Sequence, residues 1–414
     1  MDTIAISKLA IDGGRPAIDL DKRPQPKKRW GNKELDELKQ VLDQQSLFYW
    51  NGGGARRLVS GFQKLYPLAH VMPCSSGTAA IHIAILSMGL VPGDEVITSP
   101  ITDQGTLIGI LYQQGVPVFA DVDPHSYNLD PSAVAACITD KTRAIVAVHL
   151  AGNPCKMSEL KAIAAERNIV LIEDCAQAWG AEYNGSPIGT IGDFGCFSLN
   201  DFKHIGCGDG GIVGSNHAKF GPMLQMCGDK AYDRVKGGRD PEFLAPCYRM
   251  SEPQAAVAAA QVSRIPEITE KRNRFGNMLN SHLSNIPGIH PHKVESTNRC
   301  SFWFYMLRID NAAFRCSRDK FAEALAAEGV MASAGYIPTP VYKWPLFQQH
   351  NFFGGTWPIR DLGYTKMDYK TVECPNAEAI LDTAVRIEIK QWMSVEYIDS
   401  VAKAIQKVAS HYAI

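Results

Sequence analysis

Short apolar runs alternate with stretches of helical spacing through residues 95–172. The predicted strands are 95–98, 116–120, 144–150 and 169–172, and the predicted helices are 105–113, 132–138 and 157–166. Buried parallel strands have this near-continuous apolar character, and the intervening stretches repeat their apolar residues at helical spacing. The pattern therefore predicts an α/β fold with a mostly parallel central sheet covered by helices.

The apolar pattern changes after residue 251. A long helical stretch at 254–262 leads to a strand at 302–308, an amphipathic helix at 318–328 and a final helix at 396–410. These elements fit a compact α+β unit, whereas the first thirty residues are rich in Pro, Asp and Lys and show no period. We predict an N-terminal arm (1–30), a large domain (31–262) and a smaller C-terminal domain (263–414).

Composition narrows the class of protein. With 414 residues and 45% hydrophobic residues, the chain can bury a large core. Its formal net charge of -1 gives no electrostatic case for binding nucleic acid or an anionic membrane. The 11 Cys lack paired metal-type spacing, so we expect no metal site and reduced thiols. We find no signal peptide or membrane-spanning run, and expect a soluble, cytoplasmic protein.

Lys203 lies in an apolar stretch, five residues after Ser198 and shortly before a glycine cluster at 206–211. A lysine held in a pocket loses its proton more easily, and the free amine condenses with an aldehyde. Schiff-base chemistry with pyridoxal phosphate (PLP) is the first interpretation. The alternative is a lysine whose stem is buried while its ammonium reaches solvent.

Asp174 ends the predicted strand that begins at Ile169. Ligands of open α/β sheets bind at the carboxyl ends of the strands, and a carboxylate there can pair with the ring nitrogen of PLP. An equally good interpretation of Asp174 alone is the N-cap of a following helix.

A possible phosphate site precedes both residues. Ser75, Ser76, Gly77 and Thr78 open a predicted helix, whose free N–H groups and positive dipole end can hold a dianion. The same residues also form an ordinary capping sequence. Phosphate anchor, ring-nitrogen partner and Schiff-base lysine in this order are a much stronger signal than any one of them.

These motifs resemble a known family. Ser-Ser-Gly-Thr at 75–78, Glu-Asp-Cys-Ala-Gln-Ala at 173–178, the segment 197–211 with its Lys and Gly-Asp-Gly-Gly, and Tyr-Arg-Met-Ser-Glu at 248–252 resemble the DegT/DnrJ/EryC1/StrS aminotransferases. That family consists of fold-type I PLP enzymes that aminate keto sugars and keto cyclitols. The similarity extends from about Leu9 to the C-terminus.

The resemblance implies roles for single residues. Lys203 would carry PLP and then serve as the base that moves the substrate proton. Asp174 would pair with the ring nitrogen, and Gln177 would donate to the ring hydroxyl. The phosphate would bind Gly77, Thr78 and Ser198. Relatives that dehydrate sugars carry His at the lysine position, whereas here Lys203 is followed by His204.

Two positions depart from the family pattern. Asp103 stands where the family usually has an aromatic residue stacked on the cofactor ring, and an acid cannot stack. Asp103 either faces the cofactor site or caps the helix that begins near Gly105. Cys247 replaces the Asn that reaches the phosphate of the neighbouring subunit.

The resemblance implies a PLP-dependent aminotransferase that loads its amine from glutamine or glutamate. We expect a homodimer with shared active sites. The segment 9–16 resembles the branch that makes aminocyclitols and aminohydroxybenzoate precursors, which favours a free keto cyclitol or keto sugar as acceptor. A nucleotide-linked keto sugar is the alternative, and a PLP-binding regulatory protein without turnover is a third, less favoured interpretation.

Overall fold

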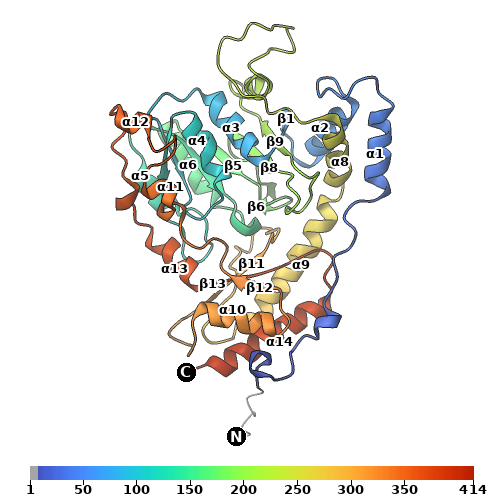
Figure 1. Cartoon of the computed structure of the whole chain (residues 1–414), viewed down its shortest axis with the longest axis vertical. Coiled ribbons are helices and arrows are strands. Elements are labelled where there is room, and N and C mark those ends of the chain that lie inside the picture. The colour runs from blue at the N-terminus through green and yellow to red at the C-terminus, as the bar shows by residue number, and fades with distance from the viewer. Residues whose placement is uncertain (1–7) are drawn as a thin grey trace.

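A seven-stranded sheet organises the larger part of the molecule (Figure 1). The computed structural model describes residues 8–414. The strand order is β1-β9-β8-β5-β4-β2-β3; β9 is antiparallel to both neighbours and the other adjacent pairs are parallel. The strands are β1 (His70–Cys74), β2 (Glu95–Thr98), β3 (Val116–Phe119), β4 (Thr142–Val148), β5 (Val170–Asp174), β8 (Phe194–Ser198) and β9 (Gly211–Ser215). The predicted α/β class with a mostly parallel sheet is confirmed.

Helices cover both faces of this sheet because successive strand residues point to opposite sides. Val96 and Ala144 pack in one core with α3 and α4, whereas Ile97 and Ile145 pack in another with α5 and α6. The helices of this part are α1 (Asn32–Leu42), α2 (Gly53–Leu65), α3 (Gly77–Met88), α4 (Gly105–Tyr112), α5 (Pro131–Cys137), α6 (Met157–Arg167), α7 (Leu224–Gly228) and α8 (Glu252–Val262). A short hairpin, β6 (Glu182–Tyr183) and β7 (Ser186–Pro187), follows β5.

A second, antiparallel sheet lies at the other end of the molecule (Figure 1). Its order is β10 (Ile289–His290), β11 (Tyr305–Ile309), β13 (Ala384–Ile387) and β12 (Ala332–Ala334). It shares a core with α9 (Ile265–Leu283), α10 (Arg318–Ala327) and α14 (Val395–Tyr412). The strand predicted at 302–308 begins later, at Tyr305, because Phe302 has a left-handed backbone with φ 41°.

The segment between β12 and β13 returns to the first sheet. Its helices are α11 (Pro345–Gln348), α12 (Pro358–Asp361) and α13 (Pro375–Thr383). Phe347, Trp357 and Tyr369 of this segment are buried in the core that contains α3 and α4. Large aromatic side chains therefore pack the segment between β12 and β13 against the large sheet.

The arm runs from the second sheet to α1 along one side of the molecule (Figure 1). The Glu328 carboxylate accepts hydrogen bonds from the N–H groups of Ala10 (2.8 Å) and Ala17 (2.7 Å), which holds its first part in place. Residues 1–7 of the predicted arm lie outside the described residues, and the predicted domain limits stay a prediction. Within residues 8–414, no helix has both the length and the hydrophobicity needed to cross a bilayer.

Candidate active site

A cavity of about 420 Å³ opens at the carboxyl ends of β5 and β8. All seven residues predicted for the cofactor site line it: Gly77, Thr78, Asp103, Asp174, Gln177, Ser198 and Lys203. They come from four separate segments of the chain, which the strand order brings to one edge of the sheet. The geometry therefore unites the predicted residues, and their roles toward a cofactor stay predictions.

The N-terminus of α3 forms one end of the cavity. Ser76 is the N-cap, and its hydroxyl accepts the Ala79 N–H at 3.0 Å. The N–H groups of Gly77 and Thr78, at the first two helical positions, have no partner within the helix. A Cβ on Gly77 would lie 2.7 Å from the Ser198 Cβ, so glycine is required for this close approach. The result is a cradle of free donors suited to a phosphate.

Asp174 is buried at the end of β5. Its carboxylate accepts hydrogen bonds from the Thr106 hydroxyl (2.8 Å) and the Ala176 N–H (3.1 Å). Burial raises the pKa of Asp174, while these two hydrogen bonds and the positive charge of Lys203 act in the opposite direction. Turns follow the strand instead of a helix, so the interpretation of Asp174 as a helix N-cap is wrong.

The Lys203 amine lies 4.0 Å from the ring centroid of Trp303. It forms no ion pair with any residue from 8 to 414. Burial lowers the pKa of Lys203, and the carboxylates of Asp174 and Asp103 oppose this shift. A half-buried amine with a lowered pKa is more readily available as a nucleophile and base.

Three residues of the cavity, two aromatic and one polar, were not predicted from the sequence. Trp303 and Tyr336 line it from the side of the second sheet, and Thr106 holds Asp174. The Tyr336 hydroxyl accepts the Gln177 amide N–H at 3.0 Å, while the Gln177 carbonyl accepts the Ala151 N–H at 2.9 Å. Gln177 thus links the large sheet to the loop after β12. Trp303 lies within the predicted strand 302–308, where an aromatic residue is ordinary, and Tyr336 belongs to no recognisable motif. The sequence therefore carries no signal for either residue.

Asp103 combines the two alternatives considered for it. Its Oδ1 accepts the Gly105 N–H at 2.8 Å, a local turn at the start of α4, and the exposed carboxylate also lines the cavity. Its Oδ2 forms no hydrogen bond with a described residue. One carboxylate oxygen is therefore structural, while the other is free to accept a hydrogen bond.

A buried pair lies behind the cavity. His149 Nε2 is 3.1 Å from Glu173 Oε2, and Glu173 also accepts the N–H groups of Gly189, Ile191 and Gly192 at 2.7–2.8 Å. His149 Nδ1 accepts the Cys155 N–H at 3.0 Å. Cys175 Sγ lies within 4.8 Å of these donor atoms, a metal-like grouping. The imidazole and the carboxylate already have hydrogen-bond partners. The pair therefore has a structural role, which is to hold the loop after β7 in place.

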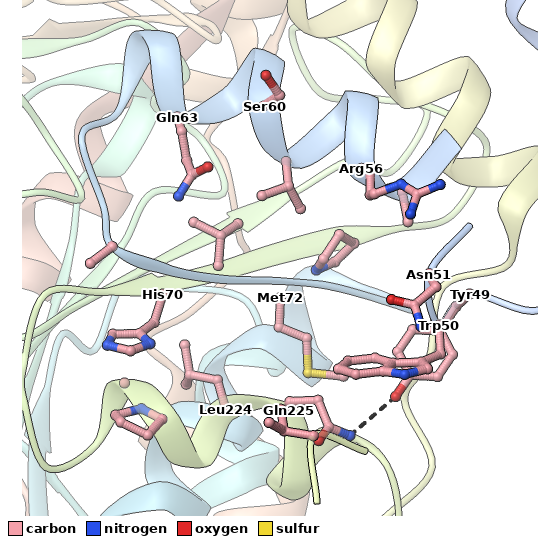
Figure 2. A pocket seen from close by; sticks show the side chains of 18 residues that line it. Tyr49, Trp50, Asn51, Arg56, Ser60, Gln63, His70, Met72, Leu224 and Gln225 are labelled. Carbon is pink, nitrogen blue, oxygen red and sulfur yellow. Dashed lines mark hydrogen bonds between the residues drawn. The ribbon is translucent and has the colours of Figure 1, made fainter. Parts of the chain in front are cut away.

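A larger cavity of about 590 Å³ lies beside the edge strand β1, between α2 and α7 (Figure 2). Figure 2 shows Trp50 at one end, His70 at the other and Met72 between them, with the Gln225 amide donating to the Tyr49 hydroxyl at 3.1 Å. Its lining contains neither a lysine nor a carboxylate. It therefore has no groups for the predicted chemistry.

The segment that contains Cys247 runs beside the phosphate cradle. The Ser75 N–H donates to the Tyr248 carbonyl at 2.8 Å, and the Tyr248 hydroxyl is 2.9 Å from His82 Nδ1. The Cys247 side chain is exposed. The preceding loop, from 229 to 246, projects from the molecule (Figure 1) and exposes Val235 and Leu244.

Comparison with known proteins agrees with this geometry. The model of the DegT/DnrJ/EryC1/StrS aminotransferase family matches residues 28–406. A putative L-glutamine:3-amino-2,3-dideoxy-scyllo-inosose aminotransferase of Micromonospora echinospora is 31% identical over 92% of this chain and 91% of its own. The spore coat polysaccharide biosynthesis protein SpsC of Bacillus subtilis is 27% identical over 91% of this chain and 95% of its own.

A solved structure of DesI in the presence of its TDP-sugar product has a TM-score of 0.80 and is 26% identical, covering 98% of this chain and 97% of that one. The family model matches nearly the whole chain, and this match shows the family. The protein belongs to the DegT/DnrJ/EryC1/StrS aminotransferases, and is an enzyme of the PLP-dependent class.

Proposed function

We propose that the protein uses PLP to transfer an amino group from glutamine or glutamate to a keto cyclitol or keto sugar. The observation that carries the proposal is the convergence of Lys203, Asp174 and the Gly77 cradle on one cavity. An amine, a buried acid and a set of phosphate donors are the three groups that PLP requires.

The residues of the cavity match the functional groups of PLP in their chemistry. Gly77, Thr78 and Ser198 would hold the phosphate, and Asp174 would pair with the ring nitrogen. When bound, PLP supplies an electron sink for the charge left on a carbon that loses its proton. Asp103 leaves its face of the cavity without an aromatic ring, while Trp303 and Tyr336 provide rings on the side of the second sheet.

Lys203 would move the proton to and from the substrate carbon. Its lowered pKa increases the fraction of neutral amine near pH 7, which general base catalysis requires. The Trp303 ring, 4.0 Å from the amine, would position the side chain of Lys203. Thr106 fixes the carboxylate of Asp174 in orientation through a 2.8 Å hydrogen bond.

The relatives support an acceptor that is a keto cyclitol or keto sugar. The Micromonospora echinospora relative bears an inosose in its name, and the DesI structure was determined with a TDP-sugar product. We prefer the free keto cyclitol or keto sugar, as the N-terminal segment 9–16 suggests, with the nucleotide-linked keto sugar as the alternative.

We propose a homodimer in which the 229–247 loop reaches the neighbouring active site. The projecting loop exposes Val235 (82%) and Leu244 (92%), apolar side chains that a partner surface would cover. Light scattering should report twice the mass of the chain. An active monomer would contradict this arrangement.

A reducing compartment suits the cysteines. All 11 are free thiols, and burial raises the pKa of several of them, including Cys175 and Cys196. Buried thiols with raised pKa values are unreactive, and unpaired cysteines are typical of cytosolic proteins. We therefore propose the cytoplasm as the site of action.

Amine transfer from labelled glutamine to a panel of cyclitol ketones and sugar nucleotides tests the proposal. Label should appear in one class of acceptor with the wild-type protein and in none with Lys203→Ala. Borohydride should fix PLP covalently to the wild type at Lys203. Turnover of Lys203→Ala at the wild-type rate would refute the assigned mechanism.

A further inference from the structure

A cavity of about 710 Å³ lies behind the loop that carries Lys203. The arm residues 23–29, α9 and the segment after β13 enclose it. Its basic residues are Arg23, Lys27, Lys28, Arg29, Lys203, Arg264, Lys271, Arg272 and Lys390, and its acidic residues are Asp201, Glu267 and Glu388. Nine cations against three carboxylates surround one space in a chain whose net charge is -1.

Two of the three carboxylates that line the cavity are already in ion pairs with lysines. Glu267 binds Lys271 at 2.7 Å, and Glu388 binds Lys390 at 3.2 Å. Arg264 is paired with Glu34 outside this set. Six cations of the lining form no ion pair with any residue from 8 to 414: Arg23, Lys27, Lys28, Arg29, Lys203 and Arg272. The field inside the cavity is therefore strongly positive.

Arg272 is the most informative of these cations because it is only 2% exposed. Its Nε donates to the Gln391 side-chain oxygen at 3.0 Å, and Nη1 donates to the carbonyls of Phe302 and Trp303 at 3.2 Å. Its Nη2 has no hydrogen-bond partner in the described part of the chain. Burial lowers the pKa of Arg272 to about 9. The Glu388 carboxylate acts on Arg272 only from a distance, without an ion pair, and a buried guanidinium in this state is a costly arrangement that an anion would relieve.

The arm is fixed at both ends of the cavity. Arg23 Nε donates to the Gly329 carbonyl at 2.7 Å beside the second sheet. Arg29 donates to the carbonyls of Asp201 and Lys203, the latter at 2.8 Å. Lys27 and Lys28 lie between these two attachment points. An anion in the cavity would thus contact an arm that is bonded directly to the backbone of the active-site lysine.

The basic cavity adjoins the candidate active site. Phe202 and Lys203 line both, and Phe202 is 78% exposed. A ligand that passes over Phe202 can reach from one cavity to the other. Six cations without ion pairs call for a ligand with at least two negative charges, and the unbonded Nη2 of Arg272 can donate to a phosphate oxygen.

We propose that the basic cavity binds a phosphate-bearing anion of the diphosphate type. The anion is either part of the acceptor, which rests on the proposed function, or a separate phosphate compound. In both cases Arg272, Lys27 and Lys28 provide the charge, and Arg29 connects the occupied cavity to the Lys203 loop.

Titration of the PLP-loaded protein with inorganic pyrophosphate by calorimetry tests the site, because the phosphate cradle of α3 is then already filled. We expect saturable binding with a Kd of about 1 mM or tighter, weakened by added salt. Absence of saturable binding would overturn the proposal, whether or not the protein transfers amines.

Variants assign the binding to the cavity. Lys27→Gln/Lys28→Gln, on the exposed arm, should weaken pyrophosphate binding by about tenfold or more. Lys64→Gln/Lys403→Gln makes the same charge change on exposed positions of α2 and α14 and should leave it unchanged. Arg272→Lys keeps a charge and removes the Nη2 donor, and should also weaken binding. Equal affinity in the arm variant and the control would contradict the site.

Pyrophosphate inhibition distinguishes the two sources of the ligand. Competition with the acceptor in the labelled-glutamine assay assigns the cavity to a phosphate on the acceptor. Binding without competition assigns it to a separate phosphate compound. Either result supports the site when the arm variant also weakens binding.

Discussion

At the scale of single residues, Asp174 and Asp103 are two carboxylates of one cavity in different surroundings. Asp174 is 5% exposed and holds two hydrogen bonds, whereas Asp103 is exposed and uses one oxygen for a turn. Separate environments allow separate tasks. The first suits a permanent partner for the cofactor, and the second suits a contact with a substrate that comes and goes.

Asp174→Asn should keep the fold and much of the PLP, because the Gly77 cradle is intact, and should lose turnover by several orders of magnitude. Thr106→Val removes the 2.8 Å hydrogen bond to Asp174 and the 2.7 Å hydrogen bond to the Thr102 hydroxyl, and should lose about tenfold. Turnover per bound PLP and the melting temperature measure the two effects. A melting temperature that falls while turnover per PLP stays constant would show a purely structural role.

Asp103→Asn keeps the side-chain oxygen that caps the Gly105 N–H but removes the charge facing the cavity. We expect a melting temperature close to that of the wild type and a drop in acceptor turnover of about tenfold, the worth of a hydrogen bond to a charged group. Asp103→Ala serves as the comparison, since it should add a stability loss of about 1 kcal/mol. Unchanged kinetics in Asp103→Asn would assign Asp103 to the turn alone.

At the scale of elements, Glu252 joins two helices. It is fully buried at the start of α8, and its carboxylate accepts the N–H groups of Gly54 (2.7 Å) and Ala55 (2.9 Å) at the start of α2. A Cβ on Gly52 would lie 2.0 Å from this carboxylate, so the glycine makes room for it. One side chain thus satisfies two free donors of a neighbouring helix.

Glu252→Gln should lower the free energy of unfolding by about 2 kcal/mol, since it weakens two charge-assisted hydrogen bonds and places a donor opposite N–H groups. Glu166→Gln, at an exposed position of α6, is the matched control and should change it by less than about 0.5 kcal/mol. Urea unfolding followed by circular dichroism measures both. Equal midpoints would mean that α2 begins independently of Glu252.

Apolar runs predicted the elements well where burial is continuous. The strands β2, β3, β4 and β5 and the helices between them occur where periodicity put them, because a parallel strand covered on both faces must be apolar throughout. The strand predicted at 302–308 fails at Phe302, whose positive φ is set by packing around Gly152 and Ser301. A constraint of this kind, imposed by residues distant in the chain, cannot be recognised in the local sequence.

The same distinction holds for the site. Lys203, Asp174 and Gly77 stand out because a charge or glycine in an apolar run is unusual, whereas Trp303, Tyr336 and Thr106 look like ordinary core residues. The positive charge of the arm indicates a binding site only in the folded structure, where Lys27 and Lys28 line the same cavity as Arg272. Spacing within a segment is visible in a sequence, and proximity between distant segments is not.

At the scale of the whole molecule, acid should unfold the protein through its buried histidines. Burial lowers the pKa of His82 to about 4 and that of His292 to about 3, and holds the pKa of His204 well below its usual range. These groups are neutral in the folded state and protonate near pH 6.5 when unfolded. Above about pH 6.5 the buried histidines leave the free energy of unfolding undiminished. As the pH falls from there toward their pKa values in the folded state, that free energy decreases.

The melting temperature should therefore fall steadily between about pH 6.5 and pH 5, where most carboxylates are still ionised. His82, bonded to Tyr248 and Gln113, is the accessible test, since His82→Gln should reduce the slope of that fall. Differential scanning calorimetry across this range provides the measurement. A flat profile in the wild type would contradict the predicted linkage.

The placement of Trp303 has one practical consequence. Its indole is in contact with the Lys203 amine, and the chain has 7 tryptophans in all. A coenzyme attached at that amine absorbs light where indole emits, so loading of the cavity should quench part of the tryptophan fluorescence. The quenched fraction should decrease in Trp303→Phe while coenzyme still binds. Trp303 would then act as an optical reporter of occupancy that needs neither substrate nor turnover.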